Sequence, residues 1–434
     1  MTATLQSNSN PHHHASTSLR QSLVEDTSKS VEEQQPLNAN QYILQRRRQL
    51  LKEASRLPVV KISPSSYPTI DISSFVEAAQ LRTLTIDKER AQQQQSVVDQ
   101  VLQCAVDTGS FHITGHGISV SLLRELDQVS RHFFQQPLDY KKSCIPANDS
   151  SHLRGYVPFL SESVPAVYEN KPSQMDQREI YGAVYGMDKD DENHRSSSTN
   201  ADGTNEEPLQ SLIDQILPEL ERVQDALHVI LTRALSQLQK VELPDDYLNM
   251  VRKNLQSLLR LSHYPSVLDE DSSSDSSTVT TDEDQHLYDH DKLIAHSDWG
   301  TLTIMTSQQC SGLQEIRQGQ WTNVPEEASG NDILHVVLGD LVHFASNGRF
   351  VNNIHRVVQD GGQGRVSLNY FAAQVPVDGS TITPLMPIVS SENRLASNLI
   401  VKFPMSPPEY WTNYYKLITL HQEEDEDLQW RQKK

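Results

Sequence analysis

The spacing of apolar residues predicts alternating strands and helices in the first half of the chain. The run YPTIDIS (67–73) has the alternation of a strand, and SFHITGHGI (110–118) predicts a second strand that ends in a glycine-containing turn. Apolar residues at helical spacing follow each of them: Val98, Val101, Leu102 and Ala105 ahead of Gly109, then Leu122, Leu126, Val129 and Phe133. This part of the chain is therefore expected to be α/β.

The pattern changes in the second half. Residues 209–238 are apolar at helical spacing and predict helices interrupted at Pro218. From Leu255 onward, short alternating segments are separated by Gly and Asn, which is typical of a β-sandwich or jelly roll. The fold class predicted for the whole chain is mixed α/β, with a double-stranded β-helix (jelly-roll) core, an N-terminal α/β domain and flanking helices.

Composition divides the chain further. Only 36% of the 434 residues are hydrophobic, so part of the chain is expected to build no core. Ser, Gln and Asn dominate its beginning, and polar acidic stretches interrupt the rest. The predicted organisation is a disordered tail (1–56), an α/β domain (57–187), an acidic insert (188–207), a helical connection (208–254), a jelly-roll domain (255–405) with an acidic loop (269–291), and a C-terminal helix and acidic tail (406–434).

The charge of the chain narrows the choice of partners. The formal net charge of −20 is concentrated in 188–207, 269–291 and 423–427, so the remaining chain is close to neutral. The only basic cluster is the triplet at 46–48, which reads as a solvated helix face or a localisation signal. Nucleic acid is therefore not an expected partner, and the acidic stretches are expected to be loops outside the core.

Cysteine content and hydropathy indicate the cellular compartment in which the protein is expected. Three scattered cysteines (Cys104, Cys144 and Cys310) are too few for a disulfide framework, and no run of 18 apolar residues is long enough to cross a membrane. The N-terminus lacks an apolar signal-peptide core. These features predict a cytoplasmic protein without a membrane partner, and a monomer is expected.

The stretch AHSDWGTLTIM (295–305) is the first candidate for chemistry. If it is one extended strand, His296 and Asp298 share a face, while Thr301 and Thr303 take the other. A carboxylate on a face with apolar neighbours needs a cation or a hydrogen bond to compensate it. A bound metal is one interpretation of this His-x-Asp, and a structural hydrogen bond is the commoner outcome for such a short motif.

A third ligand candidate is His355, which lies in the strand-like run NNIHRVV (352–358). A carboxylate and two imidazoles on facing strands would form the triad that suits iron(II) in oxygenases, leaving three positions open for a co-substrate and dioxygen. Zinc more often takes tetrahedral sites rich in His or Cys, so iron is the better interpretation. For His355 alone, a core or surface histidine without a metal is the simpler explanation.

Residues that could hold a carboxylate lie on either side of this triad in the sequence. Arg365 and Ser367 in GRVSLNYFAA (364–373) are two apart, so they share a face on a strand. A guanidinium beside a hydroxyl is well shaped to bind a carboxylate, although a salt bridge on an edge strand would explain the arginine equally. Upstream, Tyr264 in RLSHYPSV (260–267) offers a phenol for a second carboxylate.

The order of these motifs resembles that of the iron(II)/2-oxoglutarate-dependent dioxygenases of the isopenicillin N synthase-like group. The resemblance runs from about Leu57 to Phe403 outside the two acidic inserts, and includes GDLVHFASNGRFVNNIHRV (339–357). The family's His-x-Asp…His triad matches His296, Asp298 and His355, and its Arg-x-Ser pair for the distal carboxylate of 2-oxoglutarate matches Arg365 and Ser367. Where many members carry Asn-x-Tyr before Pro, this chain has Ser262, His263, Tyr264 and Pro265. Whether Ser262 replaces that asparagine is left open.

The resemblance implies a function. It implies a jelly roll with the metal between its two sheets, Fe(II) as cofactor, 2-oxoglutarate and O₂ as co-substrates, and ascorbate as a candidate reductant. The expected reaction is oxidation of a small-molecule metabolite, most simply its hydroxylation, with release of succinate and carbon dioxide. No catalytic residue beyond the metal ligands is expected.

Three alternatives remain. Isopenicillin N synthase and the ethylene-forming oxidases carry a similar triad and Arg-x-Ser pair without using 2-oxoglutarate. A non-catalytic relative could sense a small ligand, although the intact motifs argue against it. A scaffold working through the acidic, Ser-rich loops could coexist with catalysis, but a solvated disordered loop explains them more simply.

Overall fold

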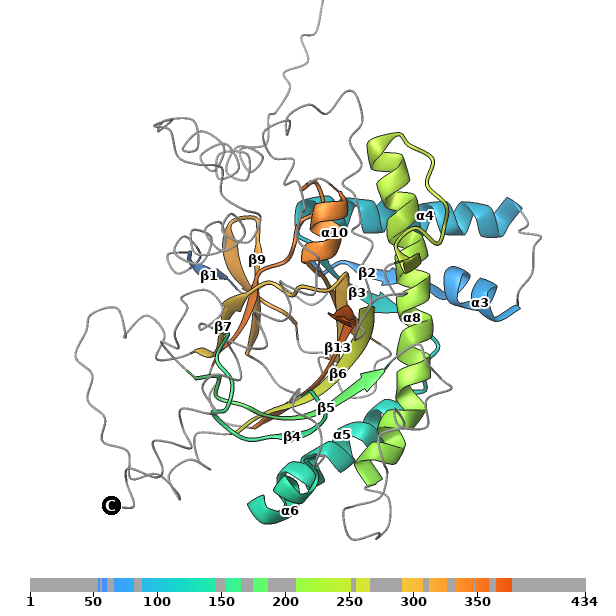
Figure 1. The fold of residues 1–434 in the computed structure, drawn as a ribbon. Helices are drawn as coiled ribbons and strands as arrows, with labels where there is room; N and C mark the ends of the chain where they lie inside the picture. The colour runs from blue at the N-terminus through green and yellow to red at the C-terminus, as the bar shows by residue number, and fades with distance from the viewer. Residues whose placement is uncertain are drawn as a thin grey trace, which may run out of the picture.

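The computed structural model describes residues 54, 57–60, 66–81, 88–145, 153–164, 175–185, 208–250, 255–265, 291–306, 312–325, 333–346, 348–358 and 364–376. Within these residues two sheets lie against each other, and helices cover the outer side of the larger one (Figure 1). This is the jelly-roll arrangement with flanking helices that the sequence predicts. None of the described helices is long and apolar enough to cross a membrane.

The smaller sheet has five strands. Its order is β1 (Val59–Val60), β10 (Gln320–Asn323), β9 (Leu313–Arg317), β12 (His355–Val358) and β7 (Asp291–His296). All neighbours are antiparallel except β1 and β10, which are parallel. The site residues of β7 and β12 are therefore on adjacent strands at one edge of this sheet.

The larger sheet has eight strands. Its order is β2 (Thr69–Asp71), β3 (Ser110–Thr114), β11 (Leu334–Leu338), β8 (Leu302–Met305), β13 (Arg365–Pro376), β6 (Leu255–Tyr264), β5 (Glu179–Tyr185) and β4 (Gly155–Val157). Strands from the first half of the chain thus extend both edges of the sheet that the second half builds. The boundary between the two predicted domains stays a prediction.

The described helices are α3 (Ser73–Leu81), α4 (Lys88–Asp107), α5 (Val120–Phe134), α6 (Leu138–Ser143), α8 (Pro208–Gln239) and α10 (Asp340–Ala345). The long helix α8 runs along the outer side of the eight-stranded sheet (Figure 1). Buried residues of α4, α5 and α8 share one core with Leu259 and Leu261 of β6. These helices therefore cover the outer face of the eight-stranded sheet.

The opposite face of β6 turns toward the five-stranded sheet. Side chains alternate along a strand, so Arg260, Ser262 and Tyr264 take the side opposite to Leu261. Tyr264 packs in a second core with apolar residues from both sheets, among them Leu293 and Val357 of the five-stranded one. The space between the sheets therefore holds the polar side chains of β6 together with apolar ones.

The predicted strands within 67–73 and 110–118 and the two predicted helices that follow them are present as β2, β3, α4 and α5. Other local predictions are wrong. Pro218 lies inside α8, which continues without interruption because buried residues on both sides of it, such as Ile216 and Leu220, hold the helix against the sheet.

The boundaries predicted for two segments, the disordered tail and the acidic loop, also differ from those in the structure. Ala54, placed in the disordered tail, is buried, and its carbonyl oxygen accepts a hydrogen bond from Nε1 of Trp321 (2.8 Å). Asp291, placed in the acidic loop, is buried in β7 and forms an ion pair with Arg356. The remainder of the predicted tail apart from Ala54, the insert 188–207, residues 269–290 of the loop and the segment 406–434 lie outside the described residues.

Candidate active site

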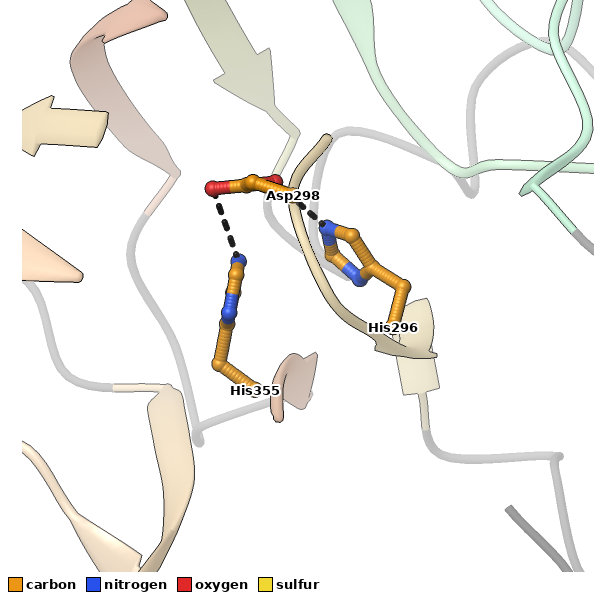
Figure 2. A group of neighbouring side chains, drawn as sticks. All are labelled: His296, Asp298 and His355. Atoms are coloured by element: carbon orange, nitrogen blue, oxygen red, sulfur yellow. Dashed lines mark ion pairs between the residues drawn. The ribbon is translucent and has the colours of Figure 1, made fainter. Parts of the chain in front are cut away.

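The three ligand candidates meet at one point between the sheets. His296 is the last residue of β7, Asp298 lies in the turn that follows, and His355 is the first residue of β12. His296 Nε2 lies 3.7 Å from Oδ1 of Asp298, and His355 Nε2 lies 3.8 Å from Oδ2 (Figure 2). One donor atom from each residue fits within 4.8 Å of the other two, which is close enough for a single metal ion to bind all three.

Strand pairing brings the two histidines together. β7 and β12 are antiparallel neighbours, and His296 and His355 are direct partners in the ladder. Their ring centroids are 4.4 Å apart. The histidines thus lie on adjacent strands of one sheet rather than on facing strands, and the carboxylate reaches them from the turn.

The turn at Asp298 breaks the stretch that the sequence presents as one strand. β7 ends at His296 and β8 begins at Leu302. A Cβ on Gly300 would lie 2.2 Å from the carbonyl oxygen of Ala372, so this turn requires a residue without a side chain. Because the strand is interrupted, Thr303 is not on the opposite side from Asp298. Its Oγ1 donates a hydrogen bond to Oδ2 of that carboxylate (2.6 Å).

Hydrogen bonds orient the ligand candidates. His296 Nδ1 lies 2.8 Å from the carbonyl oxygen of Ile294, an acceptor that requires the proton on Nδ1 and leaves the Nε2 lone pair directed toward Asp298. Asp298 is 6% exposed and His355 is 5% exposed. A buried carboxylate with an imidazole nitrogen on either side is the donor set of a divalent metal, so the residues fit Fe(II).

The carboxylate-binding candidates form two rungs of the ladder between β13 and β6. Arg365 pairs with Tyr264, and Ser367 pairs with Ser262. All four are buried. They belong to the eight-stranded sheet, so Arg365 lies across the interior from the sheet of His355 and not beside it on a neighbouring strand. A guanidinium, a phenol and two hydroxyls thus gather on one interior face.

The sequence analysis did not identify a buried polar cluster that lies beside His355. Glu315, the ladder partner of His355 on β9, accepts hydrogen bonds at Oε1 from Tyr67 Oη (2.6 Å) and from Arg317 Nη1 (2.8 Å). His335 of β11 lies 3.6 Å from Oε2 of the same carboxylate. Burial, followed by the charges of His355, Arg317 and Arg365, holds the pKa of His335 well below its usual value. The sequence indicates strands in this region, but the alternation within a strand does not show that these residues meet.

Comparison with known proteins defines the class. Residues 68–208 match the model of the non-haem dioxygenase N-terminal region named for morphine synthesis, and residues 255–374 match that of the 2-oxoglutarate-Fe(II) oxygenase superfamily. The chain belongs to the 2-oxoglutarate-Fe(II) oxygenases of the isopenicillin N synthase-like superfamily. It is therefore a 2-oxoglutarate- and Fe(II)-dependent dioxygenase.

Individual relatives are distant. The chain is 25% identical to the 2-oxoglutarate-Fe(II) type oxidoreductase hxnY of Emericella nidulans, over 73% of this chain and 81% of that protein. It is 26% identical to homoarginine-6-hydroxylase of Glycine max, over 71% and 85%. Two solved structures share the fold with a TM-score of 0.52. They are JOX2 with 2OG, Fe and JA (21% identity, covering 85% of this chain and 88% of that one), and a full-length Neurospora crassa protein in complex with alpha-KG and 5-formyluracil (20% identity, 77% and 94%).

Proposed function

We propose that His296, Asp298 and His355 hold the Fe(II) of this dioxygenase, and that Arg365, Ser367 and Tyr264 hold its 2-oxoglutarate. The observation that carries the proposal is the meeting of three donor atoms, two of them from buried residues, within 4.8 Å of one another at the junction of β7 and β12. The Arg365–Tyr264 and Ser367–Ser262 rungs in the opposite sheet support the second half of it.

The residues of the chain have distinct tasks in this proposal. When bound, Fe(II) and 2-oxoglutarate would supply, with dioxygen as the oxidant, the chemistry that releases succinate and carbon dioxide and adds one oxygen atom to the substrate. The triad leaves coordination positions open, because it provides three protein ligands to an ion that accepts six. Arg365 neutralises the distal carboxylate of 2-oxoglutarate and fixes its direction, with Ser367 and Tyr264 as further donors. The apolar cluster of Tyr264, Leu293 and Val357 excludes water from the space between the sheets.

The substrate is proposed to be a small organic metabolite, and the reaction its hydroxylation. Support comes from the relatives: one is named for the hydroxylation of homoarginine, and one solved structure holds 5-formyluracil. The cytoplasmic location and the monomeric state expected from the sequence remain proposals, which cell fractionation and size-exclusion chromatography would test.

Succinate formation tests the function directly. Purified protein is loaded with Fe(II) without oxygen, mixed with 2-oxoglutarate and air, and assayed for succinate with and without fractions of a metabolite extract. We expect slow succinate release alone and faster release with the fraction that contains the substrate. Substrate oxidation that proceeds at full rate without 2-oxoglutarate would instead favour the direct-oxidase alternative.

A further inference from the structure

A buried amide contacts both serines of the Ser367–Ser262 rung. Asn369 lies on β13 two residues after Ser367, so its side chain shares that residue's interior face. Its Nδ2 lies 3.2 Å from Oγ of Ser367 and 3.2 Å from Oγ of Ser262. The same nitrogen contacts the carbonyl oxygens of Arg260 (3.3 Å) and Ser367 (3.4 Å). Asn369 is 8% exposed.

The chemistry of these contacts fixes the direction of the amide. Carbonyl oxygens only accept hydrogen bonds, so the group facing Arg260 and Ser367 must be the donating NH₂ and not the amide oxygen. The two N–H bonds of this amide are shared among four acceptors, the two carbonyl oxygens and the hydroxyl oxygens of Ser262 and Ser367. A hydroxyl has one proton of its own, and one whose oxygen already accepts a hydrogen bond is free to donate that proton elsewhere.

We infer that Asn369 is a positioning residue for 2-oxoglutarate. It holds the Ser367 hydroxyl as an acceptor, which commits the hydroxyl proton to the distal carboxylate that Arg365 binds. Ser262 serves as the second anchor of the amide and, being fully buried beneath it, contacts Asn369 rather than the co-substrate. This inference rests on the proposed function of Arg365 and Ser367.

The inference explains how this chain departs from the family it resembles. Many members carry an asparagine at the position of Ser262, on β6. Here that position has a short side chain, and an amide reaches the same pair of serines from β13. Ser262 and Ser367 are direct partners across the ladder, so an asparagine at position 262 would lie beside Ser367. An asparagine introduced at position 262 is therefore expected to take over the donation to Ser367 when the amide of Asn369 is removed.

Two substitutions separate a donor from a space-filling residue. Asn369→Ala removes the N–H donors and leaves a gap. Asn369→Asp keeps the size and shape, but its carboxylate can only accept, so it would draw the Ser367 proton away from the co-substrate and place a negative charge beside another. If Asn369 positions Ser367, Asp is worse than Ala. If Asn369 only fills space, Asn369→Asp weakens 2-oxoglutarate only through its charge, and an amide placed at position 262 does not recover the binding lost in Asn369→Ala.

Binding measurements provide a test that does not depend on turnover. Protein loaded with Mn(II) is titrated calorimetrically with 2-oxoglutarate and, separately, with 2-oxobutyrate, which has the same chelating end and no distal carboxylate. We expect Asn369→Ala to weaken 2-oxoglutarate about tenfold and Asn369→Asp to weaken it further, with 2-oxobutyrate and Mn(II) affinities unchanged. Ser262→Asn combined with Asn369→Ala should recover most of the loss.

Asn323 on β10 provides a control for the loss of an asparagine amide. Asn323→Ala removes an amide of equal size from β10, where it accepts from Gln314, and should leave 2-oxoglutarate binding unchanged. The inference is overturned if Asn369→Asp binds 2-oxoglutarate as well as wild type or better than Asn369→Ala, or if 2-oxobutyrate weakens equally. If wild-type protein does not bind 2-oxoglutarate at all, the proposed function of the site fails instead.

Discussion

Thr303 donates a hydrogen bond of 2.6 Å from Oγ1 to Oδ2 of Asp298, the carboxylate between the two histidines. The same Oδ2 faces Nε2 of His355 at 3.8 Å. A hydroxyl that donates to a ligand oxygen fixes the carboxylate in one orientation, and such supporting contacts affect metal affinity strongly.

Replacing Thr303 should therefore weaken metal binding without removing a ligand. Thr303→Val keeps the shape of the side chain and loses the donor, so we expect metal affinity to fall about tenfold or more. Calorimetric titration with Mn(II) measures the change. Thr322→Val, on β10 of the other sheet, is the matched control, and equal affinities for the two variants would show that Thr303 does not orient the ligand.

Asp298→Ala should abolish Fe(II) binding and succinate release while the protein still folds. Two imidazoles remain, and they hold a divalent ion poorly in a site with four of six positions open. Metal content after dialysis, succinate assays and circular dichroism report the three effects. Asp139→Ala in α6, an exposed carboxylate, should change none of them. Full metal content in Asp298→Ala would make the His-x-Asp pair structural, as the simpler interpretation of the sequence had it.

The sequence singles out the three residues that the structure brings together as candidate ligands, whereas their arrangement could not be predicted from it. Residue type and order were enough to single out His296, Asp298 and His355. The turn that carries Asp298 was missed, because an alternating pattern continues through it. The physical cause is Gly300, whose position leaves no room for a Cβ against Ala372. Strand periodicity says nothing about such a contact between strands distant in the sequence.

Contacts between neighbouring strands could not be predicted from the sequence either. Alternation alone places Asn369 on the face of Ser367, but the contact with Ser262 depends on the register between β13 and β6. Register is set by strands that are separated by about a hundred residues, so the pattern within either strand does not contain it. For the same reason Glu315 and His335 were not connected to the site.

Arg365 decides between the two enzyme interpretations. Arg365→Ala should raise the apparent Michaelis constant for 2-oxoglutarate about a hundredfold, or about 3 kcal/mol, because the distal carboxylate loses its charged partner in a buried place. Arg365→Lys should restore part of the loss, since an ammonium cannot make the two-pronged contact. Metal affinity should stay the same, because no ligand is changed.

Steady-state assays of succinate against 2-oxoglutarate concentration measure this effect. Arg124→Ala on the exposed face of α5 controls for the loss of an arginine. An unchanged dependence on 2-oxoglutarate in Arg365→Ala would contradict the assignment of this residue and favour a direct oxidase.

The last prediction concerns pH and the turn that carries Asp298. His228 of α8 is fully buried, with Nδ1 2.7 Å from Oδ1 of Asn249 and Nε2 2.7 Å from Oγ1 of Thr301 in that turn. Burial lowers the pKa of His228 to about 4. In the unfolded chain the imidazole titrates near ~6.5, so below that pH the unfolded state binds a proton that the folded state does not.

The stabilisation from a neutral His228 is therefore complete above about pH 6.5 and is lost as the pH falls toward 4. By pH 5 the loss should be about 2 kcal/mol relative to pH 7.5. His228→Gln keeps a polar side chain and cannot take up the proton, so the difference in its free energy of unfolding between these two pH values should be smaller by this amount. Urea denaturation of both proteins at both pH values measures it. The buried His112 and His335 titrate in both proteins and cancel in the comparison. Identical pH dependence in wild type and His228→Gln would therefore show that burial does not keep His228 neutral in the folded protein.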